Sequence, residues 1–555
     1  MEYTFANTAH SFASHLPVTN IMGPVFLTKR GYSTDMTEKK ERNEIEKLTE
    51  RLREVTYLGT SIAVLQWDQE VNMPKKGANA RATSISLLSG LVHQKFLAID
   101  HDGLLSGLRK RLEDKKLVPS EAAIVRETWR SFSRARKLPE TFVKEMAELT
   151  SRAQNVWAEA RAENNFAKFA PYLERIVEKK REEAKLIGYE ESPYDALLDS
   201  YEPDMTTVEI ERIFTDLKTF LVPFIARLPV RCTQTGFRKV SNNKRSLVIA
   251  QGAIFPVEQQ AEFSKRIAGA MGYDLEAGRI DASTHPFTTD FHPHDVRITT
   301  RYNPKNIFES IFPTMHEVGH ALYGQGLPHE HFGTPLADAI SLGIHESQSR
   351  LWENMVGKSL PFWKHWYPKL QKEFPGVFTL PLPSFYRSLN RVTPTLIRVE
   401  ADEVTYNLHI IIRFELEKAL IEGTIEVKDL PALWNERYQE YLGIIPTTDR
   451  EGVLQDVHWS TGYIGYFPTY TLGNLYSAQF WNAAKKEIRG LEQKIAKGDL
   501  KTLREWLRKH IHRHGKLYSA ENLALAVTGE KLNPDYFSAY IRAKYGPLYG
   551  LPTEA

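Results

Sequence analysis

Two histidines and a glutamate follow the pattern H-E-x-x-H in the segment His316-Glu317-Val318-Gly319-His320. On a helix, side chains four residues apart lie on one face, so both imidazoles can bind one metal ion. Glu317 can then hold a water whose pKa a bound zinc ion lowers to about 7, and accept its proton. The pattern predicts a metal-dependent hydrolytic site; the alternative is an ordinary helix with two surface or capping histidines.

A catalytic zinc site of this kind has three protein ligands and one open position. The segment 344–350 has helical spacing and offers Glu346 and His345 as a third ligand. We favour Glu346, because a third histidine at zinc has a different usual spacing from the first two. His345 is the competing ligand, and an i,i+4 ion pair with Arg350 is the structural alternative for Glu346.

Helical periodicity dominates the rest of the chain. Apolar residues recur at three- and four-residue steps from Ile45 to Leu58, which predicts an amphipathic helix from about residue 38. Similar patterns predict helices over 118–135, 139–186, 207–227, 256–272, 400–422 and 477–512. Pro313 is typical of a first helical turn and predicts that the H-E-x-x-H helix begins there.

One segment has the character of a β-strand. Residues 296–302 alternate and are rich in β-branched side chains, so Asp295, Arg297 and Thr299 would share one face. Such a strand could bind an extended peptide by strand addition. The polar, basic segment 231–243 is predicted to be a loop.

Composition excludes several classes of protein. The 555 residues carry a net charge of only +3, so nothing indicates a nucleic-acid partner. Cys232 is the single cysteine, which excludes an intramolecular disulfide and a cysteine-based zinc site. No run approaches the roughly 18 apolar residues of a membrane span.

The first 35 residues differ from the remainder. They contain one acidic residue before Asp35 and a small basic cluster at 29–33. We interpret residues 1–35 as a flexible extension or an over-extended reading frame, with an organelle-targeting segment as the alternative. Residues 36–555 show no clear linker and are expected to form one continuous body.

Several further segments resemble the motifs of the thermostable carboxypeptidase (Taq-type, M32) metallopeptidases. They are His285-Pro286-Phe287, Asp295-Val296-Arg297-Ile298-Thr299, the H-E-x-x-H segment, His345-Glu346-Ser347-Gln348, Ile397-Arg398-Val399-Glu400-Ala401-Asp402, Gly452-Val453-Leu454-Gln455-Asp456-Val457-His458-Trp459, Trp67-Asp68-Gln69 and Met73-Pro74. The likeness extends from about residue 36 to residue 551, and no motif position departs from the pattern.

The resemblance implies a mainly α fold: a large helical body with a small β-strand element, divided by a deep substrate cleft, as in neurolysin-like and angiotensin-converting-enzyme-like gluzincins. It implies a zinc metallocarboxypeptidase of broad specificity, acting as a homodimer on peptides with a free C-terminus. We also expect a cytoplasmic location, with organellar targeting by residues 1–35 as the alternative, and expect that cobalt could replace zinc. By matching motifs, His316, His320 and Glu346 would be the ligands and Glu317 the catalytic base.

The substrate's terminal carboxylate needs a cationic partner, and the planar fork of an arginine suits it. Arg398 is the first candidate; its alternative is a helix-surface pair with Asp402. Arg297 is the second candidate, although it could instead order its strand through Asp295. Asp295 and His285 are also predicted to contact the substrate, with a turn-capping role as the alternative for His285.

The oxyanion of the transition state needs hydrogen-bond donors beside the metal. His458 is the main candidate, and Tyr466 is favoured over Tyr463 and Tyr470, although an aromatic core is the alternative for each tyrosine. Gln455 and Asp456 could orient either His458 or a metal ligand from behind.

Two other functions compete with this interpretation. An endo-oligopeptidase or dipeptidyl carboxypeptidase would share the metal chemistry and need no close carboxylate clamp. A non-catalytic helical binding protein would be expected to lack Glu317 or a ligand, and all are present.

Overall fold

The computed structural model describes residues 32–228 and 252–551, and these form a mainly helical protein with one small sheet. The helices before the sheet are α1 (Tyr32–Val71), α2 (Ala78–Leu97), α3 (Leu104–Glu113), α4 (Pro119–Lys137), α5 (Glu140–Glu163), α6 (Phe166–Ile187), α7 (Pro193–Leu198), α8 (Thr207–Arg227) and α9 (Val257–Met271). Those after it are α10 (Phe308–Gly324), α11 (Leu342–Arg350), α12 (Leu360–Glu373), α13 (Leu382–Leu389), α14 (Tyr406–Glu422), α15 (Leu430–Leu442), α16 (Pro468–Glu487), α17 (Leu491–Ala496), α18 (Lys501–His510), α19 (Ala520–Thr528) and α20 (Asp535–Tyr549). Cys232 and the predicted loop at 231–243 lie outside the described residues.

Most of the predicted helices are confirmed, and the breaks within two of the predicted runs fall at residues with positive φ angles. The region 139–186 is two helices, α5 and α6, because Asn164 has a left-handed φ of 57° between them. The run predicted at 477–512 is α16, which begins earlier, followed by α17 and α18, with positive-φ glycines at Gly490 and Gly498. The helix predicted from residue 400 begins only at Tyr406.

The sheet has the strand order β1-β3-β2. Strand β3 (Asp295–Thr300) is the predicted strand; it lies parallel to β1 (Ile280–Ala282) and antiparallel to β2 (Thr288–His292). Because β3 is central and both of its edges are paired, an extended peptide cannot add to it, and that prediction is wrong.

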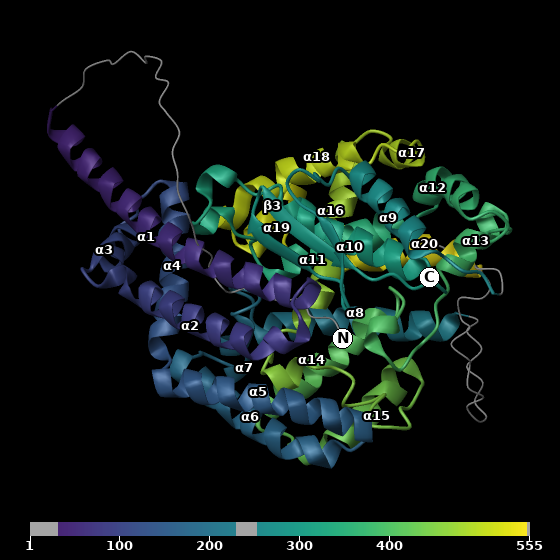
Figure 1. The fold of residues 1–555 in the computed structure, drawn as a ribbon, viewed down its shortest axis with the longest axis horizontal. Coiled ribbons are helices and arrows are strands. Elements are labelled where there is room, and N and C mark those ends of the chain that lie inside the picture. The colour runs from purple at the N-terminus through teal and green to yellow at the C-terminus, as the bar shows by residue number, and fades with distance from the viewer. Residues whose placement is uncertain (1–31, 229–251, 552–555) are drawn as a thin grey trace.

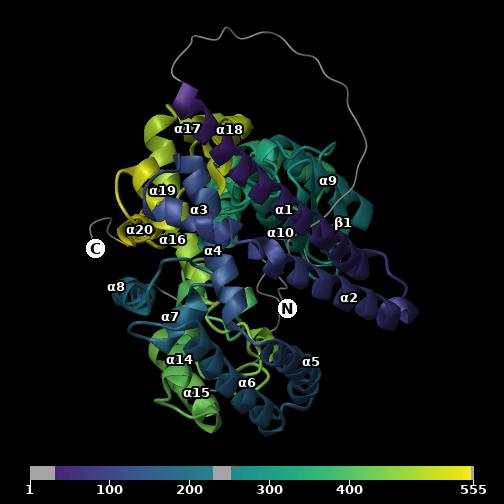
Figure 2. The same cartoon turned by 90° about the vertical axis from the view of Figure 1, so that its left-hand side faces the viewer.

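The H-E-x-x-H helix, α10, lies in the middle of the molecule (Figures 1 and 2). In both views α5, α6, α14 and α15 gather at one end, α17 and α18 lie toward the other, and α10 lies between them (Figures 1 and 2). Helix α10 begins at Phe308, so Pro313 lies inside it and does not mark its start. None of the helices in the described ranges combines the length and apolar character that crossing a bilayer requires.

Candidate metal centre

Two neighbouring helices bring three potential metal ligands together. His316 and His320 come from α10 and Glu346 from α11, and one ligand atom of each lies within 4.8 Å of the other two. Glu346 Oε2 is 3.3 Å from His320 Nε2 and 3.5 Å from His316 Nε2. Ligands about 2.0–2.1 Å from a tetrahedral ion are separated by about 3.3–3.4 Å, so the donor set fits a metal such as zinc. No other such cluster occurs among the residues that the structure describes.

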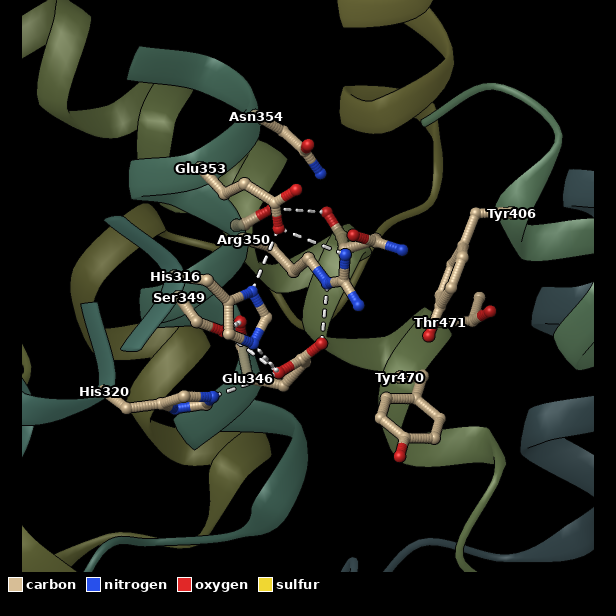
Figure 3. Close-up of polar contacts among 12 residues, drawn as sticks. His316, His320, Glu346, Ser349, Arg350, Glu353, Asn354, Tyr406, Tyr470 and Thr471 are labelled. Carbon is tan, nitrogen blue, oxygen red and sulfur yellow. Dashed lines mark hydrogen bonds and ion pairs between the residues drawn. The ribbon is translucent and has the colours of Figure 1, made fainter. Parts of the chain in front are cut away.

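His345, the competing third ligand, is not part of this cluster. Its ring stacks on that of His320, with centroids 4.3 Å apart and planes 17° apart. Glu346 also makes the alternative contact considered for it, because Arg350 Nε donates to its Oε1 at 2.6 Å while Oε2 faces the two histidines (Figure 3). The ion pair and the place among the ligands therefore involve different oxygens of one carboxylate.

Glycines let three helices approach closely around the ligands. A Cβ at Gly319 of α10 would lie 2.6 Å from the Cα of Ser349 on α11. A Cβ at Gly473 of α16 would lie 2.5 Å from Cγ of Glu346. Since neither separation is sterically allowed, only glycine permits these crossings, and the crossings fix where Glu346 stands.

A second carboxylate orients His316 from behind. Glu353 lies on a π-helix, Leu351–Gly357, that continues α11, and its Oε2 is 2.9 Å from His316 Nδ1 (Figure 3). Lys358 donates to the other oxygen at 2.9 Å. The Nδ1–H of His316 thus points at Glu353, and its Nε2 is left to face Glu346.

Charge balance sets the protonation states of the metal-free protein. Burial would raise the pKa of Glu346, but Arg350 and the two histidines hold that pKa well below its usual range. Burial also opposes the ionised form of Glu353, yet Lys358 and His316 keep its pKa low. Burial would lower the pKa of His316, and the two glutamates instead raise it to about 9. Both carboxylates are therefore ionised at neutral pH.

Glu317, the predicted base, is buried beside the edge of the sheet. The hydroxyl of Thr288 on β2 donates to its Oε2 at 2.7 Å, which leaves Oε1 for another partner. Burial raises the pKa of Glu317 above its ordinary value, which brings it closer to neutrality. A carboxylate with a raised pKa is suited to accept and return a proton near pH 7.

Asp295 and Arg297 occupy the other face of the sheet. Thr288 pairs with Ile298, and Thr289 pairs with Arg297, so the side chain of Arg297 points away from the face on which Thr288 reaches Glu317. Its Nε and one terminal nitrogen donate to the two carboxylate oxygens of Asp295 at 2.8 Å. This geometry matches the alternative in which Arg297 orders its own strand.

The ring of Trp67 on α1 covers Arg297, with the guanidinium 4.6 Å from the ring centroid. In the turn before β2, the carbonyl of His285 accepts hydrogen bonds from the hydroxyls of Ser283 and, at 3.4 Å, of Thr299. The D-x-R-x-T and H-P-F motifs therefore tie this edge of the molecule together.

Arg398 is buried and does not pair with Asp402. It lies on a short 3-10 turn, Arg398–Glu400, where its Nε donates to Asp456 Oδ1 at 2.9 Å and another nitrogen donates to the Tyr406 hydroxyl at 3.0 Å. Arg413 pairs with the other oxygen of Asp456 at 2.6 Å. The helix-surface alternative is therefore wrong, and two buried guanidinium groups share one carboxylate.

A single tyrosine connects Arg398 with the ligand helix. The ring of Tyr406 lies 4.6 Å from the guanidinium of Arg350, the residue that holds Glu346 (Figure 3). The hydroxyl of Tyr406 accepts a hydrogen bond from Arg398. The candidate carboxylate clamp and the metal ligands therefore belong to one buried polar network.

His458 lies at the start of a loop that leads into α16. Its Nε2 is 3.2 Å from the hydroxyl of Tyr470, and its ring centroid is 5.4 Å from that of Tyr466. Tyr470 is one helical turn before Gly473, which touches Glu346. Tyr470 thus links His458 to the helix that packs against Glu346. Gln455 does not bond His458; its side chain accepts from the backbone N–H of Arg398 at 2.9 Å.

Sequence reasoning missed three residues of this site: Thr288, Glu353 and Tyr406. Glu353 had a usable signal, because it follows Glu346 by seven residues and Arg350 by three, on the same helical face. Thr288 and Tyr406 had none, since each reaches its partner through tertiary packing.

Comparisons with known proteins agree with the geometry. The sequence model for the family described as "Carboxypeptidase Taq (M32) metallopeptidase" matches residues 47–545. The thermostable carboxypeptidase 1 of Thermus thermophilus is 43% identical over 516 residues, covering 91% of this chain and 98% of that protein. Carboxypeptidase 1 of Bacillus subtilis is 38% identical over 499 residues, covering 90% and 97%. The structure of Pyrococcus furiosus carboxypeptidase superposes with a TM-score of 0.83 at 38% identity, covering 90% of this chain and 99% of that one. The chain therefore belongs to the carboxypeptidase Taq (M32) family and is a metallocarboxypeptidase, a hydrolase that acts on peptides.

Proposed function

We propose that the protein is a zinc-dependent carboxypeptidase that releases single amino acids from peptide C-termini with broad specificity. The observation that carries this proposal is the convergence of His316, His320 and Glu346, with the buried carboxylate of Glu317 on the same helix. Imidazole and carboxylate donors in tetrahedral spacing suit zinc, and cobalt is expected to substitute because it accepts the same ligands.

Zinc bound by these three residues would polarise the scissile carbonyl and acidify a water molecule. Glu317 is proposed to accept the proton of the attacking water at Oε1, because Thr288 already donates to Oε2. The same oxygen would then return the proton to the leaving amine. Arg350 and Glu353 hold Glu346 and His316 in place, so the ligands need not reorganise during turnover.

Arg398 is proposed to bind the terminal carboxylate of the substrate. With Arg413 it shares a single acid, Asp456, so this trio carries one positive charge in excess. A buried excess of positive charge attracts an anion, and a guanidinium can bind a carboxylate with two parallel hydrogen bonds. His458 and Tyr466 are proposed to donate to the developing oxyanion.

The remaining expectations belong to the same proposal. They are one metallocarboxypeptidase domain over residues 36–555, a deep substrate cleft of the neurolysin and angiotensin-converting-enzyme type, a homodimer and a cytoplasmic location. Direct substrate contacts of His285, Asp295 and Arg297 also remain proposals; for the last two, the ion pair within β3 favours a supporting role.

The test uses one peptide with a free C-terminus and its amidated twin, supplied to the zinc-loaded enzyme. We expect stepwise loss of single C-terminal residues from the free peptide and much slower cleavage of the amide. Equal cleavage of both would favour the endo-oligopeptidase or dipeptidyl alternative.

The matched variant for the chemical step is Glu317→Gln. It should retain the metal at wild-type stoichiometry and lose nearly all turnover, because an amide cannot accept the proton. Wild-type activity in this variant would refute the assignment of the base.

A further inference from the structure

A carboxylate from α14 lies directly behind the residues proposed to stabilise the oxyanion. Glu417 is completely buried and accepts three hydrogen bonds. The indole N–H of Trp459 donates to Oε1 at 2.8 Å, while the hydroxyl of Tyr194 and the backbone N–H of Gly465 donate to Oε2 at 2.8 and 3.1 Å. Both oxygens are therefore engaged.

These three bonds replace the counter-ion that a buried carboxylate usually needs. Within the described part of the chain, no lysine, arginine or histidine forms an ion pair with Glu417. Burial raises the pKa of Glu417 to about 7, which expresses the cost of keeping this charge away from water. A buried charge is expensive, and the three hydrogen bonds, together with the positive charge of the more distant Arg413, compensate for it.

Two of the three donors come from one short segment, residues 458–467, which we call the catalytic loop. Trp459 directly follows His458, and Gly465 directly precedes Tyr466. The carboxylate thus holds the loop at both ends of its irregular part, next to each of the two proposed oxyanion donors. The third donor, Tyr194, comes from α7 and lies outside the loop.

The path of the catalytic loop needs such an external anchor. Gly462 and Gly465 have φ angles of 75° and 92°, so the chain turns through conformations that other residues rarely adopt. A Cβ at Gly465 would lie 2.9 Å from the carbonyl carbon of Leu197, so the loop also presses against α7. A backbone N–H buried in such a turn has no helical or sheet partner, and Glu417 provides one.

We propose that Glu417 is a positioning residue, which fixes the catalytic loop so that His458 and Tyr466 are already aimed at the oxyanion before substrate binds. The proposal rests on the oxyanion role assigned to those two residues under the proposed function. Preorganised donors stabilise the transition state because they need no reorientation as charge develops. Loosening the loop should therefore slow the chemical step more than it weakens substrate binding.

The primary variant is Glu417→Gln. Glutamine keeps the shape, but its NH₂ group must face either the indole N–H of Trp459 or the N–H of Gly465, and two donors repel each other. The matched control is Tyr194→Phe, which removes the one donor that does not belong to the catalytic loop and leaves both loop contacts in place. Measurements are made at pH 8, where Glu417 is ionised.

For Glu417→Gln loaded with zinc, we expect kcat to fall about 10- to 100-fold, with KM and the metal stoichiometry near their wild-type values. Tyr194→Phe should lower the unfolding temperature and keep kcat within about twofold. Wild-type kcat in Glu417→Gln would overturn the proposal, as would an equal loss of kcat in both variants or a loss of metal in Glu417→Gln.

If Glu417→Gln does not fold, Trp459→Phe carries the test, because it removes one loop contact and retains a ring. A fall in kcat of about three- to tenfold at unchanged KM supports the proposal, and wild-type kcat overturns it. His458→Gln is measured alongside. Full turnover of that variant with intact metal would refute the oxyanion role itself, separately from the anchoring role of Glu417.

Discussion

Replacing Glu353 by glutamine should weaken metal binding without changing any ligand. Glu353 is the only described partner of His316 Nδ1, at 2.9 Å, and it is ionised because Lys358 and Arg350 also face it. A carboxylate in this position makes the imidazole a stronger donor at Nε2 and fixes the tautomer. Glutamine keeps an acceptor oxygen of the same reach but removes the charge.

The size of the effect follows from the loss of charge alone. Partners of this kind alter metal affinity by about 10- to 100-fold when they are removed, which is about 1.4–2.8 kcal/mol. Removing Glu353 also leaves Arg350 and Lys358 less compensated beside the ion, and like charges disfavour it. Both effects act in the same direction, so we expect the upper part of this range.

The measurement is the dissociation constant for zinc, obtained by competition with a chromogenic chelator at fixed pH. The matched control is Lys358→Met, which releases the other oxygen of Glu353 and leaves the contact with His316 intact. This control should weaken binding less than tenfold. A wild-type dissociation constant in Glu353→Gln, or a larger effect in the lysine variant, would show that the Glu353–His316 contact does not tune the ligand.

Two further predictions concern packing and protonation. Gly473→Ala places a Cβ against Glu346 and should weaken the free energy of zinc binding by about 1–3 kcal/mol. The control is Gly269→Ala, because no atom lies within 4 Å of the Cβ added to that helical glycine, and zinc binding should not change. Equal zinc affinity in the two variants would contradict the packing argument. Burial raises the pKa of Glu202 to about 7, so the folded protein retains that proton at a higher pH than the unfolded chain does, and this part of the stability is complete below about pH 4.5 and is lost as the pH rises to about 7. Glu202→Gln should abolish this part of the pH dependence. In denaturant titrations, the free energy of unfolding of the variant relative to that of the wild type should therefore rise by about 3 kcal/mol between pH 4.5 and pH 8. A difference that stays constant with pH would refute this prediction.

The sequence predicts those parts of the site that depend on local spacing. His316 and His320 converge because one helical turn separates them, and Glu346 and Arg350 pair for the same reason. Strand β3 is recognisable because its alternation is local. These features depend on residues fewer than eight positions apart, where backbone geometry alone decides which side chains meet.

The contacts that complete the site join residues far apart in the chain. Thr288 reaches Glu317 across 29 residues, and Arg398 reaches Asp456 across 58. On a helix, the four-residue spacing would bring Arg398 close to Asp402, and from the sequence alone an ion pair on the helix surface is the ordinary expectation. The fold instead buries Arg398, and a guanidinium removed from water must form an ion pair with whichever carboxylate lies beside it, here that of Asp456.

The same physical argument explains why so many charges lie under this site. A peptide hydrolase must hold a divalent cation and a substrate anion close together in a region with little water, where each unbalanced charge is costly. Arg350 takes part in this balance, since it neutralises Glu346 on one side and packs on Tyr406 on the other, and Tyr406 in turn accepts from Arg398. Glu202 and Glu417 are also buried and form no ion pair in the described part of the chain. Glu202 accepts a bond from the N–H of Gly343 in α11, and Glu417 accepts one from the N–H of Gly465 in the catalytic loop. Burial of these two acids costs stability once they ionise, while the bonds that they accept hold the first turn of α11 and the catalytic loop in place.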